Sequence, residues 1–404
     1  MPSLAIGVNK RLAYKLESVW GTLAGATGAQ VLRRVTSDFN LKKEVYSSNE
    51  IRPDYQVAVF NHGVRSADGS IKGELSPGTY SAFLGSLLAK NFVAGSVIAS
   101  LSITIAASGS NFTLTRAAGS WITDGINVGD VTRFTAGTFN AANSNNNMLV
   151  VSVTALALTV RVLSSTALVA EGPIASASLT VVGKKTNVPL TGHTDQSYTV
   201  EEFYQDIAQS ETYSGMKVGS ASVTLPATGF ATIDLSFMGK DLALKGTSGY
   251  FTTPTAAATT GVVAAVNGAV IVGGAVVAII TDASLKIDRK MEGATVLGSN
   301  SQANIFTGVI GVTGSLSVYF QDTQFRDYFD AESEVSLVFA LTTDSSKTAE
   351  AVSFTVPRAK IGSFTKADKD TGITASCDFT ALLNSVTAAG LPATTLQVQD
   401  TLAA

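Results

Sequence analysis

The fold is decided by residues 68–88, DGSIKGELSPGTYSAFLGSLL, where an alternating segment runs directly into a helical one. Within 70–75, apolar and polar side chains alternate with the period of a β-strand that has one buried face. Ser76 then suits a helix N-cap and Pro77 the first helical position. Apolar residues recur at helical spacing after Pro77. We therefore expect a strand over 70–75 and an amphipathic helix over 76–91.

Similar alternation recurs further along the chain and predicts more strands of the same kind. These segments are 232–237, 315–321, 335–341 and 373–379. Two of them also lead into candidate capped helices, 322–330 after Asp322 and 378–386 after Asp378. The irregular, wide spacing does not suit a solenoid. The pattern predicts a mainly β protein of antiparallel sheets with one or two short helices lying across a sheet face.

Composition limits the possible functions. The 404 residues are 45% apolar and only 15% charged, with a net charge of −3. Avid duplex binding needs clustered Lys and Arg, so this balance argues against it. The single cysteine excludes an intrachain disulfide framework, and the N-terminal residues show no signal-peptide pattern.

The middle of the chain differs in texture. Residues 98–183 are nearly free of charge and rich in Ser, Thr, Ala and Val. We expect them to form a small all-β domain inserted into a larger discontinuous domain, which comprises 36–97 and 184–400. The polar stretch 140–147, NAANSNNN, is predicted to be a mobile loop tip.

Residues 261–280 have the length and apolarity of a membrane span. Asn267-Gly268 and Gly273-Gly274 interrupt them, and Asn-Gly is a strong hairpin signal. No Lys, Arg or Trp marks a membrane boundary. We therefore predict one or two apolar β-hairpins here, within a long apolar hairpin or loop over 246–280, and no membrane partner.

The first 35 residues show no strong period. We interpret them as an extended N-terminal arm carrying Trp20. Docking of this arm on a neighbouring subunit and packing on its own domain are about equally compatible with the pattern.

Catalytic chemistry is poorly represented. His62 and His193 lie in polar, glycine-containing contexts that predict surface loops. No zinc spacing, nucleophile elbow or phosphate-binding loop is present. The clusters 201–211 and 327–334 are acidic, and we interpret both as solvated charged faces. Cys377 falls on the apolar side of its strand and is predicted to be a buried small hydrophobe. We predict no catalytic, cofactor or metal site.

Residues 35–91 resemble the N-terminal part of the tail tube proteins, or major tail proteins, of long-tailed bacteriophages. The matching features are S-x-E-I-R-x-D (Ser48, Glu50, Ile51, Arg52 and Asp54), the strand Gly69 to Leu75, the helix start Ser76 to Tyr80, the arm-like Glu17 to Gly25, and Phe112 to Thr138, which is similar to β-domains inserted in such subunits.

The resemblance implies two packed antiparallel β-sheets with a flanking helix, in a sandwich or barrel typical of tail tubes. It also implies that six copies join sheet edges around a channel, and that rings stack through arms and long loops. The partners would be the chain itself, other tail proteins and viral DNA, which passes without sequence-specific binding. The protein would be assembled in the host bacterial cytoplasm and reside in the virion tail.

Physical reasoning supports this picture, because exposed sheet edges are a liability unless another copy pairs with them. The alternatives are a surface adhesin or receptor-binding module, an outer-membrane barrel, an enzyme on a β-scaffold, and another virion ring protein such as a collar or tail terminator. The residues predicted to contact neighbouring subunits are Trp20, Asn267, Gly268, Val270 and Val272.

Overall fold

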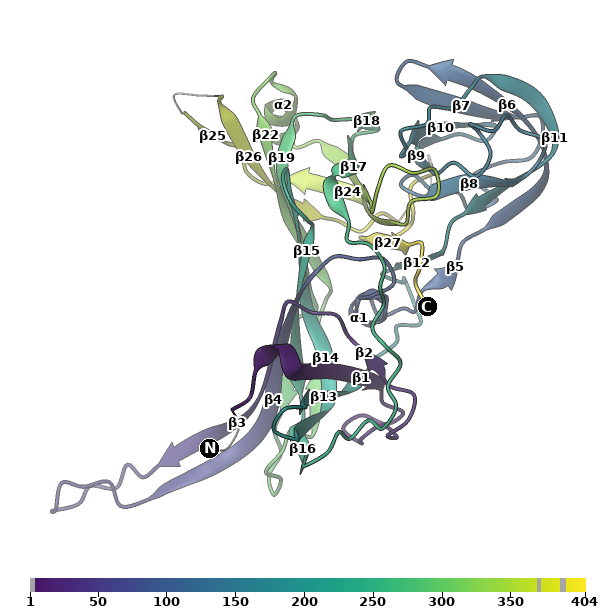
Figure 1. Ribbon diagram of the computed structural model, residues 1–404. Helices are drawn as coiled ribbons and strands as arrows, with labels where there is room; N and C mark the ends of the chain where they lie inside the picture. The colour runs from purple at the N-terminus through teal and green to yellow at the C-terminus, as the bar shows by residue number, and fades with distance from the viewer. Residues whose placement is uncertain (1–3, 369–371, 386–389) are drawn as a thin grey trace.

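The computed structural model describes residues 4–368, 372–385 and 390–404, and the protein is mainly β (Figure 1). All five alternating segments of the sequence are strands. They are β4 (Phe60–Glu74), β15 (Thr232–Gly239), β22 (Gly311–Tyr319), β23 (Glu334–Thr342) and β26 (Thr374–Ala381).

One long antiparallel sheet runs through the molecule. Its strand order, from the pairing registers, is β3–β4–β15–β14–β19–β22–β26–β25. The strands not yet defined are β3 (Thr36–Ser47), β14 (Gln209–Pro226), β19 (Ile280–Asp288) and β25 (Thr365–Ala367).

Two further groups of strands pack against this sheet. The 18-residue strand β14 pairs through its first half with β13 and β16, and β13 pairs with β1. Likewise β24 pairs with β23 and β27, and β23 pairs with β17. Their bounds are β1 (Lys10–Leu16), β13 (Tyr198–Tyr204), β16 (Asp241–Gly246), β17 (Ala264–Val272), β24 (Ala351–Ile361) and β27 (Gln397–Asp400).

The main hydrophobic core lies between the layers, with large aromatic residues such as Phe83, Phe237 and Phe379 inside it. This arrangement confirms the predicted fold of two packed antiparallel sheets. Short elements complete it: η1 (Gly7–Asn9), β2 (Gln30–Val31), β5 (Val93–Ala94), β12 (Lys184–Asn187), β18 (Ala275–Val276), β20 (Glu292–Ala294) and β21 (Asn304–Phe306).

The first 35 residues are not a free arm. Strand β1 pairs with β13 over its whole length, and Leu12 and Ala13 are buried. Glu17 is also buried, and its carboxylate accepts hydrogen bonds from backbone and hydroxyl groups of β13 and β14. The segment belongs to the sheet of its own chain because its apolar face completes that core.

The structure contains two of the three expected helices. They are α1 (Ser81–Leu87) and α2 (Gln324–Asp330), which begin later than predicted. The third prediction, 378–386, is wrong over its described part: Asp378 and Phe379 lie in β26, and 382–385 have no helical structure. Residue 386 lies outside the described residues. Burial of alternate β26 side chains explains why strand pairing overrides the helical spacing there.

Residues 97–181 form a closed six-stranded barrel at the upper right of Figure 1. Its strands are β6 (Val97–Ser108), β7 (Asn111–Arg116), β8 (Val131–Ala136), β9 (Met148–Val153), β10 (Ala157–Val162) and β11 (Glu171–Val181). Gly95 donates its backbone N–H to Gly183 O at 3.0 Å, so the chain enters and leaves the barrel at one place. The barrel core also includes Ile271 and Val338 from outside the barrel.

The asparagine-rich loop 140–147 is packed, contrary to the prediction of a mobile loop tip. Asn143, Asn146 and Asn147 are buried, with 0% or 1% of their surface exposed. Asn143 Nδ2 donates to Val169 O at 2.8 Å, and Asn147 Nδ2 donates to Ala349 O at the same distance. Side-chain amides can replace missing backbone partners, so this polar run packs the barrel against the rest of the chain and is not a free tip.

Candidate assembly surfaces

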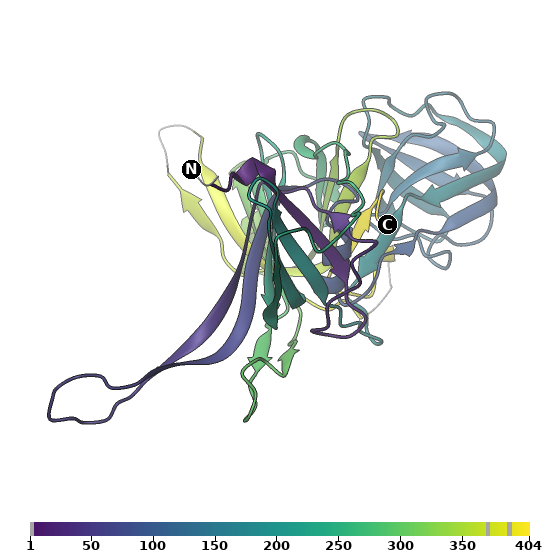
Figure 2. The ribbon, with the colours of Figure 1, turned by 60° about the horizontal axis from the view of Figure 1, so that its bottom comes forward.

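A long hairpin projects from the long sheet (Figures 1 and 2). It consists of the outer halves of β3 and β4 and the loop 48–59, and we call residues 45–60 the main hairpin tip. Antiparallel pairing continues to Ser47 and Phe60, with one register shift between Lys43 and Val45, so the base is a paired ladder. The fold therefore holds this tip away from the body on a paired, two-stranded support.

The main hairpin tip is apolar and uncovered. The exposed fractions of its large apolar side chains are Val45 53%, Tyr46 53%, Ile51 99%, Tyr55 97%, Val57 72%, Val59 49% and Phe60 59%. Contiguous exposed apolar surface of this kind marks an interaction site. Sequence reasoning used 48–54 for the family resemblance but did not select these residues as contacts. The sequence signal for them was the spacing of Tyr55, Val57 and Val59 at every second residue.

Local contacts give the loop its shape. Ser48 N–H donates to Val59 O at 2.9 Å, and Arg52 forms an ion pair with Asp54 at 3.0 Å. The hydrogen bond from the Arg52 guanidinium lowers the pKa of the Asp54 carboxyl. Ile51, which precedes this exposed pair, is almost fully exposed and belongs to no core.

A second, smaller hairpin extends from the same sheet and is formed by β20 and β21. It projects beside the base of the first hairpin in Figure 2. Its residues Val296 and Leu297 are 51% and 104% exposed, and Phe306 is 61% exposed. The protein thus presents two apolar hairpins from one sheet.

The long sheet also ends in two open edges. Among the described strands, β3 pairs only with β4 and β25 only with β26. Two carbonyl oxygens of β3 accept from side chains of the same chain: Ser37 O from Lys10 Nζ at 2.6 Å and Phe39 O from Tyr213 Oη at 2.7 Å. A carbonyl oxygen can accept two hydrogen bonds, so β3 can still pair with a further strand along this edge.

The predicted contact residues do not gather on one surface. Trp20 is half-buried, and its Nε1 donates to Gly215 O at 3.1 Å, with Lys217 and Lys240 over its ring. Val272 is 1% exposed and belongs to the core of the single chain, so its surface is not free for the predicted contact.

Asn267 and Gly268 lie within β17, at an irregularity in its pairing with β23, and do not form the turn. The turn of this hairpin is instead Gly273-Gly274, where both residues have positive φ. Val270 is partly buried against the core.

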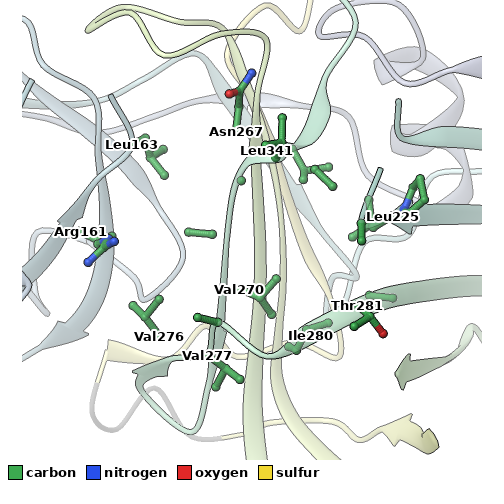
Figure 3. Close-up of a pocket in the computed structure, with 18 of the residues that line it drawn as sticks. Arg161, Leu163, Leu225, Asn267, Val270, Val276, Val277, Ile280, Thr281 and Leu341 are labelled. Atoms are coloured by element: carbon green, nitrogen blue, oxygen red, sulfur yellow. The ribbon is translucent and has the colours of Figure 1, made fainter. Parts of the chain in front are cut away.

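A cavity of about 530 Å³ separates this hairpin from the barrel. Figure 3 shows Val270, Val277 and Ile280 on one side, with Arg161 and Leu163 of the barrel opposite. The lining is largely aliphatic and holds no convergent set of catalytic groups. Burial raises the pKa of the one carboxyl in it, Asp282.

The acidic cluster at 201–211 is not a solvated face, contrary to expectation. Glu201 is 0% and Glu202 2% exposed. Glu201 pairs with Arg11 at 3.1 Å and accepts from Ser210 Oγ, and Glu202 pairs with Lys10 at 2.7 Å. Paired and hydrogen-bonded carboxylates tolerate burial, so these groups tie β1 to the sheet.

The remaining reactive residue types are placed as follows. Cys377 is fully buried, as predicted, and desolvation raises its thiol pKa to about 11. His193 is in an exposed loop, whereas the exposed His62 lies in β4 and not in a loop. Within the described residues, no three His, Cys, Asp or Glu side chains could hold a metal ion. No helix in the same part of the chain is long and apolar enough to cross a membrane.

Open sheet edges and apolar hairpins are the prominent features of the surface of the described residues. They are typical of a β protein that associates with other chains. The family model for phage tail tube proteins matches residues 7–381, so the chain belongs to the phage tail tube protein family. No curated protein sequence matches it significantly.

Proposed function

We propose that this protein is the non-enzymatic subunit of a phage tail tube, which assembles into stacked rings and forms the conduit for DNA ejection into the host. The family match supports a structural role in the virion tail. The resemblance implies six positions around each ring. Its partners are copies of itself, other tail proteins, and DNA in the channel.

The observation that carries the proposal is the main hairpin tip. An isolated protein gains nothing from holding Ile51 and Tyr55 almost fully in water at the end of a paired ribbon. The ribbon extends beyond the body of the molecule, as Figure 2 shows, and this supports a contact with a neighbouring ring. Docking of the tip on that ring removes the apolar surface from water and links the rings along the tube.

We also propose that the barrel at 97–181 is an inserted domain carried by the tube unit. Its entry and exit strands are joined by the Gly95–Gly183 hydrogen bond, and its core is mostly its own. The barrel lies at the side of the molecule away from the main hairpin tip in Figure 1. This position leaves the tip and the open sheet edges free for assembly.

Negative-stain electron microscopy of the purified protein tests the proposal. We expect rings or hollow tubes as the concentration is raised. Sedimentation velocity at the same concentrations should show the corresponding loss of single chains. A protein that stays monomeric at high concentration, under conditions where its unfolding remains cooperative, contradicts the tube function.

A further inference from the structure

The strand pairing of the chain contains one pattern twice. In the first pattern β1 pairs with β13, β13 with β14, β14 with β16 and β15, and β15 with β4, which pairs with β3. In the second, β17 pairs with β23, β23 with β24, β24 with β27 and β26, and β26 with β22, which pairs with β19. The helices α1 and α2 follow β4 and β22, at equivalent points.

The registers agree residue by residue. Gly69 of β4 lies opposite Phe39 on one side and Phe237 on the other. Gly314 of β22 lies opposite Leu285 and Phe379 in the same way. Equivalent strands therefore carry equivalent glycine and aromatic positions.

Short sequence identities occur at the matching places. Residues 69–71 are Gly-Ser-Ile and residues 314–316 are Gly-Ser-Leu. Residues 217–220, Lys-Val-Gly-Ser, lie in β14, and 360–363, Lys-Ile-Gly-Ser, run from β24 towards β25. Because pairing order, register and these residues coincide, we infer that the chain consists of two tube units related by internal duplication, with the barrel inserted in the first.

The two units are joined by strand pairing. The outer edge of β14, Ser220–Pro226, pairs with β19, Asp288–Asp282. The duplication maps the first five residues of this β14 edge, Ser220–Thr224, onto residues 363–367 of the second unit. It also maps β19 onto β3 of the first unit. Both mapped segments are open edges of the long sheet. They lie apart in Figure 1, with β25 at the upper left and β3 at the lower left.

We propose that successive copies of the chain join head to tail by pairing residues 363–367 of one copy with β3 of the next, in the register of the internal β14–β19 junction. This inference rests on the proposed function and names the contact that closes its ring. The register places Ser363 opposite Lys42, Thr365 opposite Asn40, and Ala367 opposite Asp38.

The side chains suit this register. Phe364 and Leu41 are each half-buried in the single chain, and the register sets them opposite one another. Thr365 and Asn40, on the other face, are exposed, like the water-facing face of an antiparallel sheet. The equivalent internal pair, Ala221 and Ile287, is fully buried at 0% exposure each, which is the state that the new pairing gives to Phe364 and Leu41.

The duplication also fixes the number of chains. The six copies that the resemblance implies then correspond to six units from three chains, since each chain supplies two units. Each chain supplies the eight strands β3, β4, β15, β14, β19, β22, β26 and β25, so three chains close a sheet of 3 × 8 = 24 strands. At about 4.8 Å between strands, the 24 strands of three chains give a ring roughly 37 Å in diameter, and the 48 strands of six chains give roughly 73 Å. Strand tilt increases both diameters. The smaller ring already leaves a channel for one duplex, so six chains are not needed.

Disulfide trapping tests the contact. Thr365→Cys and Asn40→Cys are placed in separate chains, mixed, assembled and oxidised; directly opposite strand residues have the Cα separation that a disulfide requires. We expect a two-chain product on a non-reducing gel, and from the double variant a ladder that ends at a closed three-chain species. The buried Cys377 stays in place, because it is inaccessible to the oxidant.

Two control variants fix the interpretation. Ser222→Cys with Lys286→Cys, the equivalent internal pair, should cross-link within one chain without a change in chain number. Thr365→Cys with Lys43→Cys, which is off the register, should give little product. Tubes that form without the two-chain product overturn this contact and leave the tube function intact, whereas a ladder that closes at six chains overturns the chain count. Absence of any assembly overturns both the contact and the proposed function.

Discussion

Replacement of Ile51 by Asp separates the folding of this protein from its assembly. Ile51 is 99% exposed at the main hairpin tip and belongs to no hydrophobic cluster. The free energy of unfolding should therefore change by no more than about 0.5 kcal/mol, as is usual for surface substitutions. If the tip docks on another copy, the same side chain becomes buried in the tube.

The size of the assembly defect follows from that burial. Complete burial of an isoleucine side chain contributes about 1.5–3 kcal/mol, and each 1.4 kcal/mol corresponds to a tenfold change in an equilibrium constant. The concentration at which tubes appear should therefore rise roughly 10- to 100-fold for Ile51→Asp. Desolvation of the new carboxylate would increase this further.

Light scattering across a concentration series measures the threshold, and thermal unfolding monitored by circular dichroism measures stability. Val8→Asp is the matched control, because Val8 is 93% exposed but lies outside the tip. Its threshold should match that of the unmodified protein. An unchanged threshold for Ile51→Asp, with tubes of normal appearance, would refute the docking role of the tip.

Three further predictions concern stability. Arg11→Ala should lower the free energy of unfolding, measured by urea titration, by about 3–5 kcal/mol, because it leaves the Glu201 carboxylate buried without its cation. Arg11→Lys should recover part of the loss, and an unchanged stability of Arg11→Ala would contradict the role of Arg11 as the partner of Glu201. Burial raises the pKa of Asp400 to about 6, so between pH 4 and 6 the folded state binds more protons at this residue than the unfolded state. The free energy of unfolding should therefore fall by roughly 2 kcal/mol as pH rises through this window. Asp400→Asn should flatten that pH dependence, and an unchanged slope would argue against the assignment. Replacing 97–182 by a direct join should leave a cooperatively unfolding but association-prone protein on size-exclusion chromatography, because Ile271 loses its cover; loss of cooperative unfolding would show that the barrel is part of the tube fold.

Local periodicity was sufficient to predict four of the eight strands of the long sheet, β4, β15, β22 and β26, and also β23 outside it. Residues such as Leu316 and Val318 alternate with polar neighbours because one face of β22 packs against the core. The same rule failed at 378–386, where Phe379 satisfies both a strand and a helical spacing. Pairing with β22 decides between them, and that pairing is not visible in a local window.

The burial of polar groups could not be predicted for a different reason. Glu201 and Asn147 occur in polar stretches that resemble solvated surface. Their partners, Arg11 and Ala349, are 190 and 202 residues away in sequence. Only the folded chain brings donor and acceptor together, so composition alone suggested solvent exposure.

The duplication was hidden because its two copies share so few residues. The identities noted are short: Gly-Ser-Ile against Gly-Ser-Leu, Lys-Val-Gly-Ser against Lys-Ile-Gly-Ser, and Phe237 against Phe379. The barrel interrupts the first copy and not the second, which removes any constant spacing. Strand order preserves the relationship, since pairing register constrains which face is buried and not which side chain fills it.

The contact between Gly95 and Gly183 has a consequence for how such subunits diversify. The two ends of the barrel are joined by a single backbone hydrogen bond. For the rest of the chain, the barrel is therefore equivalent to a short surface loop. Any module whose termini lie equally close can occupy that position without stretching the strands on either side, provided that it shields Ile271 and Val338. In the proposed tube, the inserted domain could therefore change while the channel and the ring geometry are conserved.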